Sequence, residues 1–237
     1  MEPFNVGTNG SHGPIGVLVN PSGECEPQVL QIQAWAREIG LDIVDLGTSA
    51  APSDLVPGCE LVIALGGDGT ILRALQLAMA RHAAVLGVNF GTVGFLADID
   101  GDDLGAALDK ITRGEATVDT RTALVARMHD APDRPVIAFN DVVIARIPGH
   151  GTAHLRVQVG GRPILALAGD GIVVASPTGS TAYTVGAGAR GVRAGRRGPR
   201  RTCAGACAPG APCAGRRGSR HPPPRAYRGS CARRSRR

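Results

Sequence analysis

Hydrophobic residues in the first half of the chain follow two alternating patterns. Apolar runs, typical of buried strands, occupy residues 15–19, 61–65 and 84–88, and residues 41–44, interrupted only by Asp42, also predict a strand. Between and after them, apolar residues recur at spacings of three and four, which predicts helices over residues 29–39, 71 to about 81 and 104–111. Pro27 suits the first turn of the first helix and Gly40 its C-terminal cap. This alternation over residues 13–118 predicts an α/β domain with a parallel sheet.

The helical period disappears beyond about Val118. Short β-prone runs follow one another at residues 123–128, 136–139, 142–147, 155–159, 164–167 and 172–175, separated by Gly, Pro, Asp and His. Closely spaced short strands of this kind are typical of a mostly β domain. We therefore predict a second, β-rich domain over residues 119–188.

The last 49 residues, 189–237, have a composition that differs from the rest of the chain. They contain no Leu, Ile, Met, Phe or Trp, and 38 of the 49 are Ala, Arg, Gly or Pro. Ordering a residue costs about 1–2 kcal/mol, which so little apolar surface cannot offset, so we predict disorder. Because all four amino acids have codons that begin with two G or C bases, we expect a shifted reading frame in a GC-rich gene. A natural arginine-rich tail is the alternative.

The charge is divided in the same way. Residues 1–188 hold eleven Lys and Arg against twenty Asp and Glu, a net charge of −9, whereas residues 189–237 hold fifteen Arg and no acid. An acidic body has no electrostatic footprint for nucleic acid, so nucleic-acid binding would rest on the tail alone.

Cysteine usage and hydropathy bear on the compartment. The body has only Cys25 and Cys59, and we expect a cytoplasmic, reducing location. Residues 1–11 show no signal-peptide pattern and no apolar run reaches eighteen residues, so no membrane partner is expected. The tail cysteines lack the paired spacing of zinc knuckles, so no metal site is predicted.

A glycine-rich turn, Gly66-Gly67-Asp68-Gly69-Thr70, joins a predicted strand to a predicted helix. Backbone N–H groups and the helix dipole favour a phosphate at such a junction. Asp68 is the one acid there, and a carboxylate beside phosphates is unfavourable unless it orients or deprotonates a hydroxyl. The structural alternative is a tight turn in which Asp68 is a local cap.

A second motif contains the last predicted strand of the β-rich domain and the residues that follow it. Residues 169–183 read GDGIVVASPTGSTAY, and a cluster of hydroxyls and glycines in this place can hydrogen-bond a ribose or an amide and admit a flat ring. Together with GGDGT and with Asn140-Asp141, this stretch resembles the NAD kinase family over residues 13–188. The resemblance implies an α/β N-terminal domain and a mostly β C-terminal domain, here incomplete.

The activity implied by the resemblance is phosphorylation of NAD to NADP. Asp68 would be the general base that takes the proton of the adenosine ribose 2′-hydroxyl as this attacks the γ-phosphate of ATP, with Mg²⁺ or Mn²⁺ as the accompanying ion. Lipid kinases also carry GGDGT, and the PTGSTAY stretch distinguishes the two. Polyphosphate as donor and NADH as acceptor stay open, and the resemblance implies a homo-oligomer.

Site residues follow from the same resemblance. Asn140 and Asp141 would hold the NAD ribose or adenine, and Asp170 would contact the nicotinamide half. His154 lies near a position where the family often has a basic residue. The phosphates would be lined by Gly66, Gly67, Gly69, Thr70 and Arg73, and the dinucleotide by Thr181, Ala182, Tyr183, Thr184, Val185 and Gly186.

Some of these residues could have a purely structural role, and at other positions the sequence differs from the family pattern. Asp141 could simply begin a strand, Arg73 could be a solvated charge, and His154 could decorate a surface loop. Ala168 stands where many members have Arg, and Gly186 where a Ser is common. The family's C-terminal third, which completes the β domain, has no counterpart here. A catalytically impaired NAD-binding remnant is therefore the alternative function.

Overall fold

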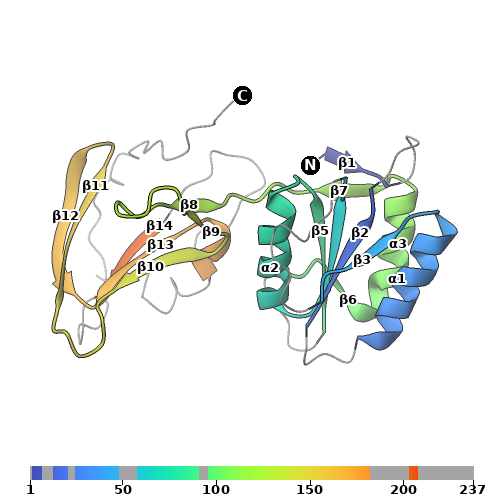
Figure 1. Cartoon of the computed structure of the whole chain (residues 1–237), viewed down its shortest axis with the longest axis horizontal. Helices are drawn as coiled ribbons and strands as arrows, with labels where there is room; N and C mark the ends of the chain where they lie inside the picture. Colours follow the sequence, from blue (N-terminus) through green and yellow to red (C-terminus); the bar gives the residue numbers. More distant parts are fainter. Residues whose placement is uncertain are drawn as a thin grey trace, which may run out of the picture. The chain divides into compact units, whose positions relative to one another are not determined.

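The computed structural model describes residues 2–6, 13–20, 25–47, 58–90, 96–181 and 203–207. The chain divides into two compact units (Figure 1). Unit 1 is Met1–Arg121 with Ile137–Phe139, and unit 2 is Thr122–Val136 with Asn140–Arg237. Unit 1 contains a parallel sheet with helices and unit 2 is β-rich, which confirms the predicted fold class.

Unit 1 is built on a five-stranded parallel sheet of order β3-β2-β4-β5-β6. Its strands are β2 (Ile15–Val19), β3 (Ile43–Asp45), β4 (Leu61–Leu65), β5 (Ala84–Asn89) and β6 (Ile99–Asp100). The sequence predicts the bounds of β2 and β4 correctly and places β3 two residues early. A separate antiparallel pair joins β1 (Glu2–Phe4) to β7 (Ala116–Val118). Neither these strands nor β6 were predicted, because two or three residues carry too little pattern.

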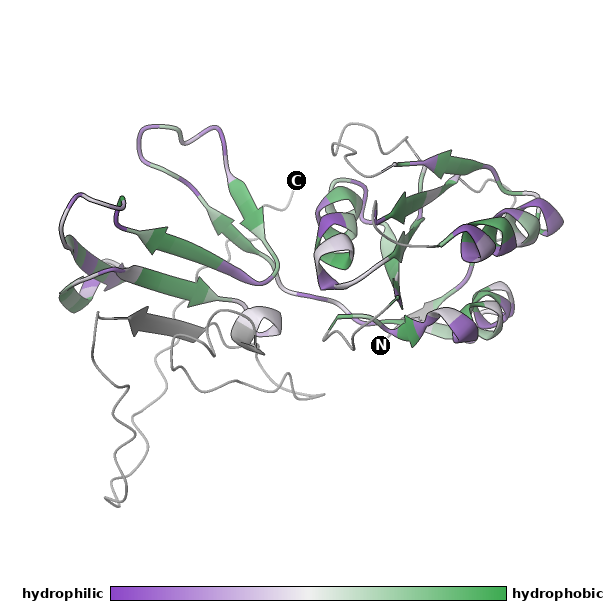
Figure 2. Ribbon diagram, turned by 90° about the horizontal axis from the view of Figure 1, so that it is seen from below, coloured by the Kyte–Doolittle hydropathy of each residue, from purple (hydrophilic) through white to green (hydrophobic). Residues whose placement is uncertain are grey.

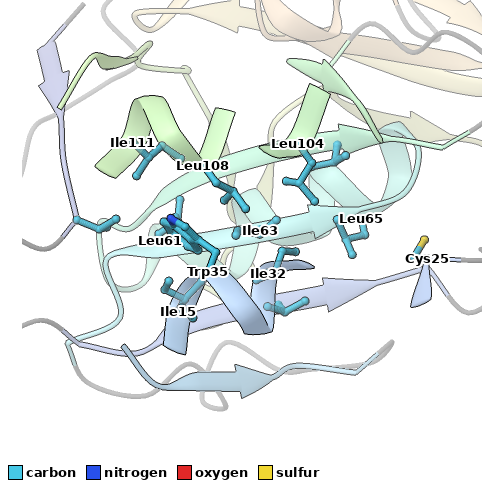
Figure 3. Packing of buried hydrophobic residues seen from close by; sticks show 14 residues of the cluster. Ile15, Cys25, Ile32, Trp35, Leu61, Ile63, Leu65, Leu104, Leu108 and Ile111 are labelled. Atoms are coloured by element: carbon cyan, nitrogen blue, oxygen red, sulfur yellow. The ribbon is translucent and has the colours of Figure 1, made fainter. Parts of the chain in front are cut away.

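Helices cover both faces of this sheet (Figure 1). On one face, α1 (Glu26–Glu38) and α3 (Leu104–Thr112), which follows a 3₁₀ turn at Gly101–Asp103, pack on Leu61, Ile63 and Leu65 (Figure 3). On the other face, α2 (Asp68–Met79) packs on Val62 and Ala64. A strand buried on both sides needs apolar residues at every position, which explains the uninterrupted apolar runs.

Helix α1 shows how far the apolar pattern is followed. Pro27 lies in the first turn and Gly40, at φ +72°, follows the C-cap, both as predicted. Ile32, Trp35 and Ala36 are buried. Leu30, included in the predicted apolar positions, is 65% exposed, because two residues on a helix turn it about 200° away from Ile32. That part of the prediction was wrong.

The start of α2 also differs from the prediction. The sequence places the helix from Ile71, after the glycine turn, whereas α2 begins at Asp68. Gly67 is the N-cap, and its carbonyl oxygen accepts hydrogen bonds from the N–H groups of Thr70 (3.0 Å) and Ile71 (3.2 Å). An acid in the first turn is favoured by the helix dipole, so Asp68 can begin the helix without loss.

The β-rich part consists of short antiparallel sheets. All six predicted β-prone runs contain a strand, namely β8 (Leu124–Ala126), β9 (Val136–Ala138), β10 (Asp141–Ala145), β11 (Ala153–Val159), β12 (Arg162–Gly169) and β13 (Gly171–Ala175). β8 pairs with β9, β11 with β12, and β10 with β13. A short 3₁₀ helix, η3 (Thr178–Thr181), follows β13.

One segment of the tail is a strand, whereas the sequence predicts disorder for residues 189–237. β14 (Cys203–Cys207) pairs antiparallel with β13. Backbone pairing along a free strand edge needs no large side chain, so a run of Ala, Gly and Cys can make it. The rest of the tail lies outside the described residues, and its disorder and shifted frame stay predictions. In the part of the chain that the structure describes, no helix is long and apolar enough to cross a membrane.

Candidate functional site

The glycine turn of unit 1 lies where the strand order reverses. From β2 the chain moves to β3 on one side and then to β4 on the other, and ligands bind at such switch points, beyond the carboxyl ends of the strands. A Cβ on Gly66 would lie 2.5 Å from the Thr70 Oγ1 and 2.9 Å from the Asn20 Cβ. Gly66 is therefore required by a close approach, and Asn20, not predicted as a site residue, belongs to the same corner.

After Gly66, the backbone at the start of α2 has open space around it. A Cβ on Gly67 or on Gly69 would meet nothing within 4 Å. Packing therefore does not require these two glycines, whereas a phosphate approaching the backbone N–H groups would. Thr70 and Arg73 are three residues apart on α2 and so lie on the same face of the helix.

Asp68 is half-buried in the first turn of α2. Its Oδ1 accepts a hydrogen bond from the backbone N–H of Leu96, at 3.0 Å. Leu96 comes 28 residues later, after β5, and the contact orients one edge of the carboxylate. A carboxylate held beside an open helix N-terminus can take a proton from a hydroxyl that approaches a bound phosphate.

Asn89 is a candidate site residue that the sequence analysis missed. It ends β5, next to β4 in the sheet, and is only 7% exposed. Its Nδ2 donates to the Asp100 Oδ1 at 3.4 Å, while its own Oδ1 is buried without a hydrogen-bond partner among the described residues. Such an acceptor costs about 1–3 kcal/mol, which a ligand hydroxyl or amino group would relieve. The available signal was an amide at the end of a buried strand.

In unit 2, the two predicted motif stretches come together. The Asn140 carbonyl oxygen accepts a hydrogen bond from the Ser176 N–H (2.8 Å), and the Ser176 Oγ accepts one from the Gly179 N–H (3.1 Å). A Cβ on Gly179 would collide with the carbonyl of Asn140, and Asp141 pairs with Ala175 in the β10–β13 ladder. Asn140, Asp141, Ser176 and Gly179 therefore form one group, which we call the Asn140 group.

Asp170 lies at the other end of the same ladder. It precedes β13 and is five residues from Ala175, roughly 17 Å of extended strand. Its Oδ1 accepts a hydrogen bond from the Arg146 Nε at 2.6 Å, and its carbonyl oxygen accepts one from the Arg146 N–H at 2.8 Å. The structure thus pairs Asp170 with Arg146, which the sequence did not single out, and separates it from the Asn140 group.

The remaining predicted site residues are placed as follows. His154 is on β11, not in a loop, and is the cross-strand partner of Ala168 on β12. The loop assignment was wrong because β11 begins at Ala153, two residues before the predicted run at residues 155–159. Thr181 ends η3, and residues 182–186 lie outside the described residues.

Two further features bear on ligand binding. Among the described residues, no group of three or more His, Cys, Asp or Glu could hold a metal ion. A cavity of about 380 Å³ lies beside the first turn of α1, lined by Val19, Cys25, Glu26, Val29 and Leu30. Its lining is apolar apart from one acid, which does not suit a phosphate.

Comparison with known families gives two matches along the chain. Residues 27–116 match the model of the ATP-NAD kinase N-terminal domain. Residues 139–195 match that of the ATP-NAD kinase C-terminal domain, seven residues past the predicted break in resemblance. Together the two matched segments contain both glycine motifs and the Asn140 group.

Curated relatives agree with this. An NAD kinase of Nocardia farcinica is 41% identical over 133 residues, which are 55% of this chain and 41% of the relative. NAD kinase 2 of Streptomyces avermitilis is 38% identical over 160 residues, 66% of this chain and 53% of the relative. The chain thus spans about half the length of these relatives.

Solved structures share the fold. A yeast NADH kinase complexed with NADH superimposes with a TM-score of 0.66 at 21% identity, covering 78% of this chain and 60% of that one. An NAD kinase from Archaeoglobus fulgidus in complex with ATP gives 0.63 at 22% identity, covering 83% and 73%.

Proposed function

The chain belongs to the NAD kinase family, and on this premise we propose that it transfers the γ-phosphoryl group of ATP to the adenosine ribose 2′-hydroxyl of NAD. The observation that carries the proposal is the position of Asp68. It combines a carboxylate, oriented by the Leu96 N–H, with an open glycine backbone at a helix N-terminus. A base and a phosphate site side by side are what a phosphoryl transfer to a hydroxyl needs.

The reaction follows from this arrangement. Asp68 accepts the 2′-hydroxyl proton while the oxygen forms a bond to the γ-phosphorus, and the bond from that phosphorus to the β–γ bridging oxygen breaks to release ADP. The backbone of Gly67 and Gly69 and the N-terminus of α2 stabilise the phosphate charge. Arg73, farther along the same face of α2 as Thr70, is the candidate for a side-chain contact to the phosphates.

A divalent ion, Mg²⁺ or Mn²⁺, belongs to the proposal as the companion of ATP. It would neutralise charge on the β- and γ-phosphates. Asp68 is the one acid of the glycine turn, so the phosphate oxygens and water would supply most of its ligands, as is usual for Mg²⁺.

The NAD side is proposed to lie in unit 2. Asn140 and Asp141 would hold the adenosine ribose or adenine, supported by Ser176 and Gly179, which fix the backbone around them. A cytoplasmic location and a homo-oligomer are parts of the same proposal. For the location, the support is that Cys25 and Cys59 are free and buried, as in a reducing compartment.

The test is NADP formation by the full chain from NAD, ATP and Mg²⁺, measured with a coupled assay. Asp68→Asn keeps the shape but cannot accept the proton, so turnover should fall about 10²- to 10⁴-fold while NAD binding stays largely intact. Asp102→Asn, which changes an exposed acid in the 3₁₀ turn before α3, is the matched control and should keep full turnover.

Two results would change this view. A fully active Asp68→Asn variant would show that Asp68 has only a structural role in the turn. NAD binding by the unmodified chain without any turnover would support the alternative function, an NAD-binding protein that has lost catalysis.

A further inference from the structure

Asn89 ends β5 on the face of the sheet that α2 covers. Side chains alternate between the two faces along a strand, and Val85 of β5 packs against the buried cluster beneath α2. A Cβ on Gly87 would lie 2.8 Å from the Ile71 Cδ1, so this face of β5 contacts the start of α2. Asn89 follows Gly87 by two residues and is therefore on the same face.

Asn89 is also level with the first turn of α2. Because β4 and β5 are parallel, α2 between them runs back from the carboxyl ends of the strands. From Gly87, β5 advances about 6.6 Å to Asn89. From Ile71, α2 extends about 4.5 Å in the same direction to Asp68. Asn89 and Asp68 therefore lie at the same edge and on the same face of the sheet.

One segment after β5 contacts both side chains. The backbone N–H of Leu96 donates to the Asp68 Oδ1 at 3.0 Å. Four residues later, the Asp100 Oδ1 accepts a hydrogen bond from the Asn89 Nδ2 at 3.4 Å. Asp100 is also the cross-strand partner of Asn89 in the β5–β6 pair. Residues 96–100 thus orient the carboxylate of Asp68 and the amide of Asn89 together.

The amide oxygen of Asn89 lacks a donor. The residue is only 7% exposed, and its Oδ1 is buried without a hydrogen-bond partner in the part of the chain that the structure describes. Reversing the amide would not supply one, because a carboxylate such as Asp100 can only accept. A buried acceptor in this state is unfavourable until a donor reaches it. Next to the proposed base, the protein therefore offers a second acceptor.

A ribose presents two adjacent hydroxyl groups, and the proposed reaction uses only one. The 2′-hydroxyl gives its proton to Asp68, and the 3′-hydroxyl on the neighbouring carbon is a second donor. An amide oxygen accepts a hydrogen bond but does not take up a proton, so it can orient this diol without competing with the base. A divalent ion is the other group that an amide oxygen could bind.

From these observations we propose that the amide oxygen of Asn89 binds the 3′-hydroxyl of the adenosine ribose of NAD, and so directs the 2′-hydroxyl toward Asp68. The proposal rests on the function proposed above. In it, Asn89 is a specificity-determining residue for a ribose that carries both hydroxyls. Asp100 is a positioning residue, since it holds the amide in the orientation that turns the oxygen to the ligand.

The experiment compares two acceptors on the full chain, NAD and the NAD analogue that contains 3′-deoxyadenosine. For each, kcat/KM of phosphorylation and the equilibrium affinity without ATP are measured. The unmodified chain should prefer NAD about tenfold, the loss expected for one hydrogen bond. Asn89→Ala should lower both values for NAD about tenfold and leave those for the analogue unchanged, so that the preference disappears.

A second variant tests the same contact without altering a buried residue. Asp100→Ala changes an exposed side chain and frees the amide of Asn89 to rotate, so the preference for NAD should fall about threefold. Asn5→Ala is the matched control, a half-buried asparagine of unit 1 that lies beside Gly114, after the end of α3. It should leave the preference unchanged. Thermal melts verify that each variant is folded, and if Asn89→Ala is not, Asp100→Ala and the analogue decide.

Three results would overturn the role of Asn89 while leaving the NAD kinase assignment intact. In the first, the unmodified chain has no preference for NAD. In the second, Asn89→Ala weakens both acceptors by the same factor, as a structural role would. In the third, Asn89→Ala needs more Mg²⁺ at an unchanged preference, which would make the amide oxygen a metal ligand.

The proposed function can fail separately. If the unmodified chain bound both acceptors without phosphorylating either, catalysis would be lost from the proposal, and the two affinities would still decide the role of Asn89. If it bound neither acceptor, the proposed function would fail, and this inference with it.

Discussion

The two units contain similar strands but bury them to different degrees. In unit 1, every residue of β4 is buried, and two clusters of buried side chains lie on the two faces of the sheet. In unit 2, Val143 and Ile144 of β10 are each 52% exposed, and Ile164 and Leu165 of β12 are also exposed. Figure 2 shows that strands of both units are nonetheless mainly hydrophobic.

The two units differ in the elements that cover their sheets. Helices α1, α2 and α3 cover the parallel sheet on both faces, whereas η3 is the only helix that the structure describes within unit 2. An antiparallel sheet can leave one face to solvent, and a two-stranded pair such as β11–β12 is marginal by itself. Hydrophobicity of a strand therefore predicts that it forms, and the neighbouring layer decides whether it is buried.

The largest effect on stability is expected from the same substitution made in both units. Ile63→Ala removes a side chain that is 0% exposed and should lower the free energy of unfolding by about 2–5 kcal/mol. Ile144→Ala, at 52% exposure, should cost less than about 1 kcal/mol. Denaturation followed by the fluorescence of Trp35, the one tryptophan and a core residue of unit 1, measures the first variant, and far-UV circular dichroism measures both. Equal losses would mean that unit 2 is covered in solution.

Glycine variants test whether both motif turns are tightly packed in spite of this difference. Gly66→Ala in unit 1 and Gly179→Ala in unit 2 each place a methyl group where there is no room, so each should destabilise by about 1–3 kcal/mol. Gly67→Ala has open space and is the control for stability. It should melt like the unmodified chain but bind ATP more weakly, because its methyl group would meet the phosphate. If Gly179→Ala had the same melting temperature as the unmodified chain, the turn in unit 2 would be able to rearrange.

A smaller effect is expected at the contact between two covering helices. The Trp35 Nε1 of α1 donates to the Thr112 Oγ1 of α3 at 2.9 Å. Trp35→Phe should lower the free energy of unfolding by about 1–2 kcal/mol, from the lost hydrogen bond and some lost packing. Circular dichroism is the measurement, since the fluorophore is removed. In a double-mutant cycle with Thr112→Ala, additive losses would show that the hydrogen bond contributes nothing.

The smallest effect concerns pH and Asp98, an exposed residue of unit 1 whose carboxyl is partly desolvated by neighbouring atoms. This desolvation raises the pKa of the Asp98 carboxyl above the ordinary value of 3.8, and the attraction of Arg121 offsets only part of the rise. With the folded pKa raised, the favourable contribution is present below pH 3.8 and is lost as pH rises through the folded value. The Asp98→Asn variant should therefore be more stable than the unmodified chain at pH 7. The difference in their free energies of unfolding should become smaller towards pH 4. Urea midpoints across this range measure it, and a less stable Asn variant at pH 7 would mean that the Arg121 contact dominates.

The sequence predicted the local parts of the fold well for a physical reason. β2 and β4 agree residue for residue because burial on both faces demands an unbroken apolar run, and α1 agrees because Pro27 and Gly40 mark its ends. The incorrect predictions also have local causes. Leu30 fits the apolar spacing but lies on the wrong side of the helix, and β6 is too short to carry a pattern.

For the candidate site, the sequence by itself determined which residues were candidates for the chemistry, apart from Asn89, and the tertiary structure decided which of them meet. The glycine turn and Asp68 are predictable because strand, turn and helix are adjacent in the chain. The contacts of Asp68 with Leu96, of Asn140 with Ser176, and of Arg146 with Asp170 span 24 to 36 residues. Such contacts depend on strand order and register, which arise only when separate segments pack against one another.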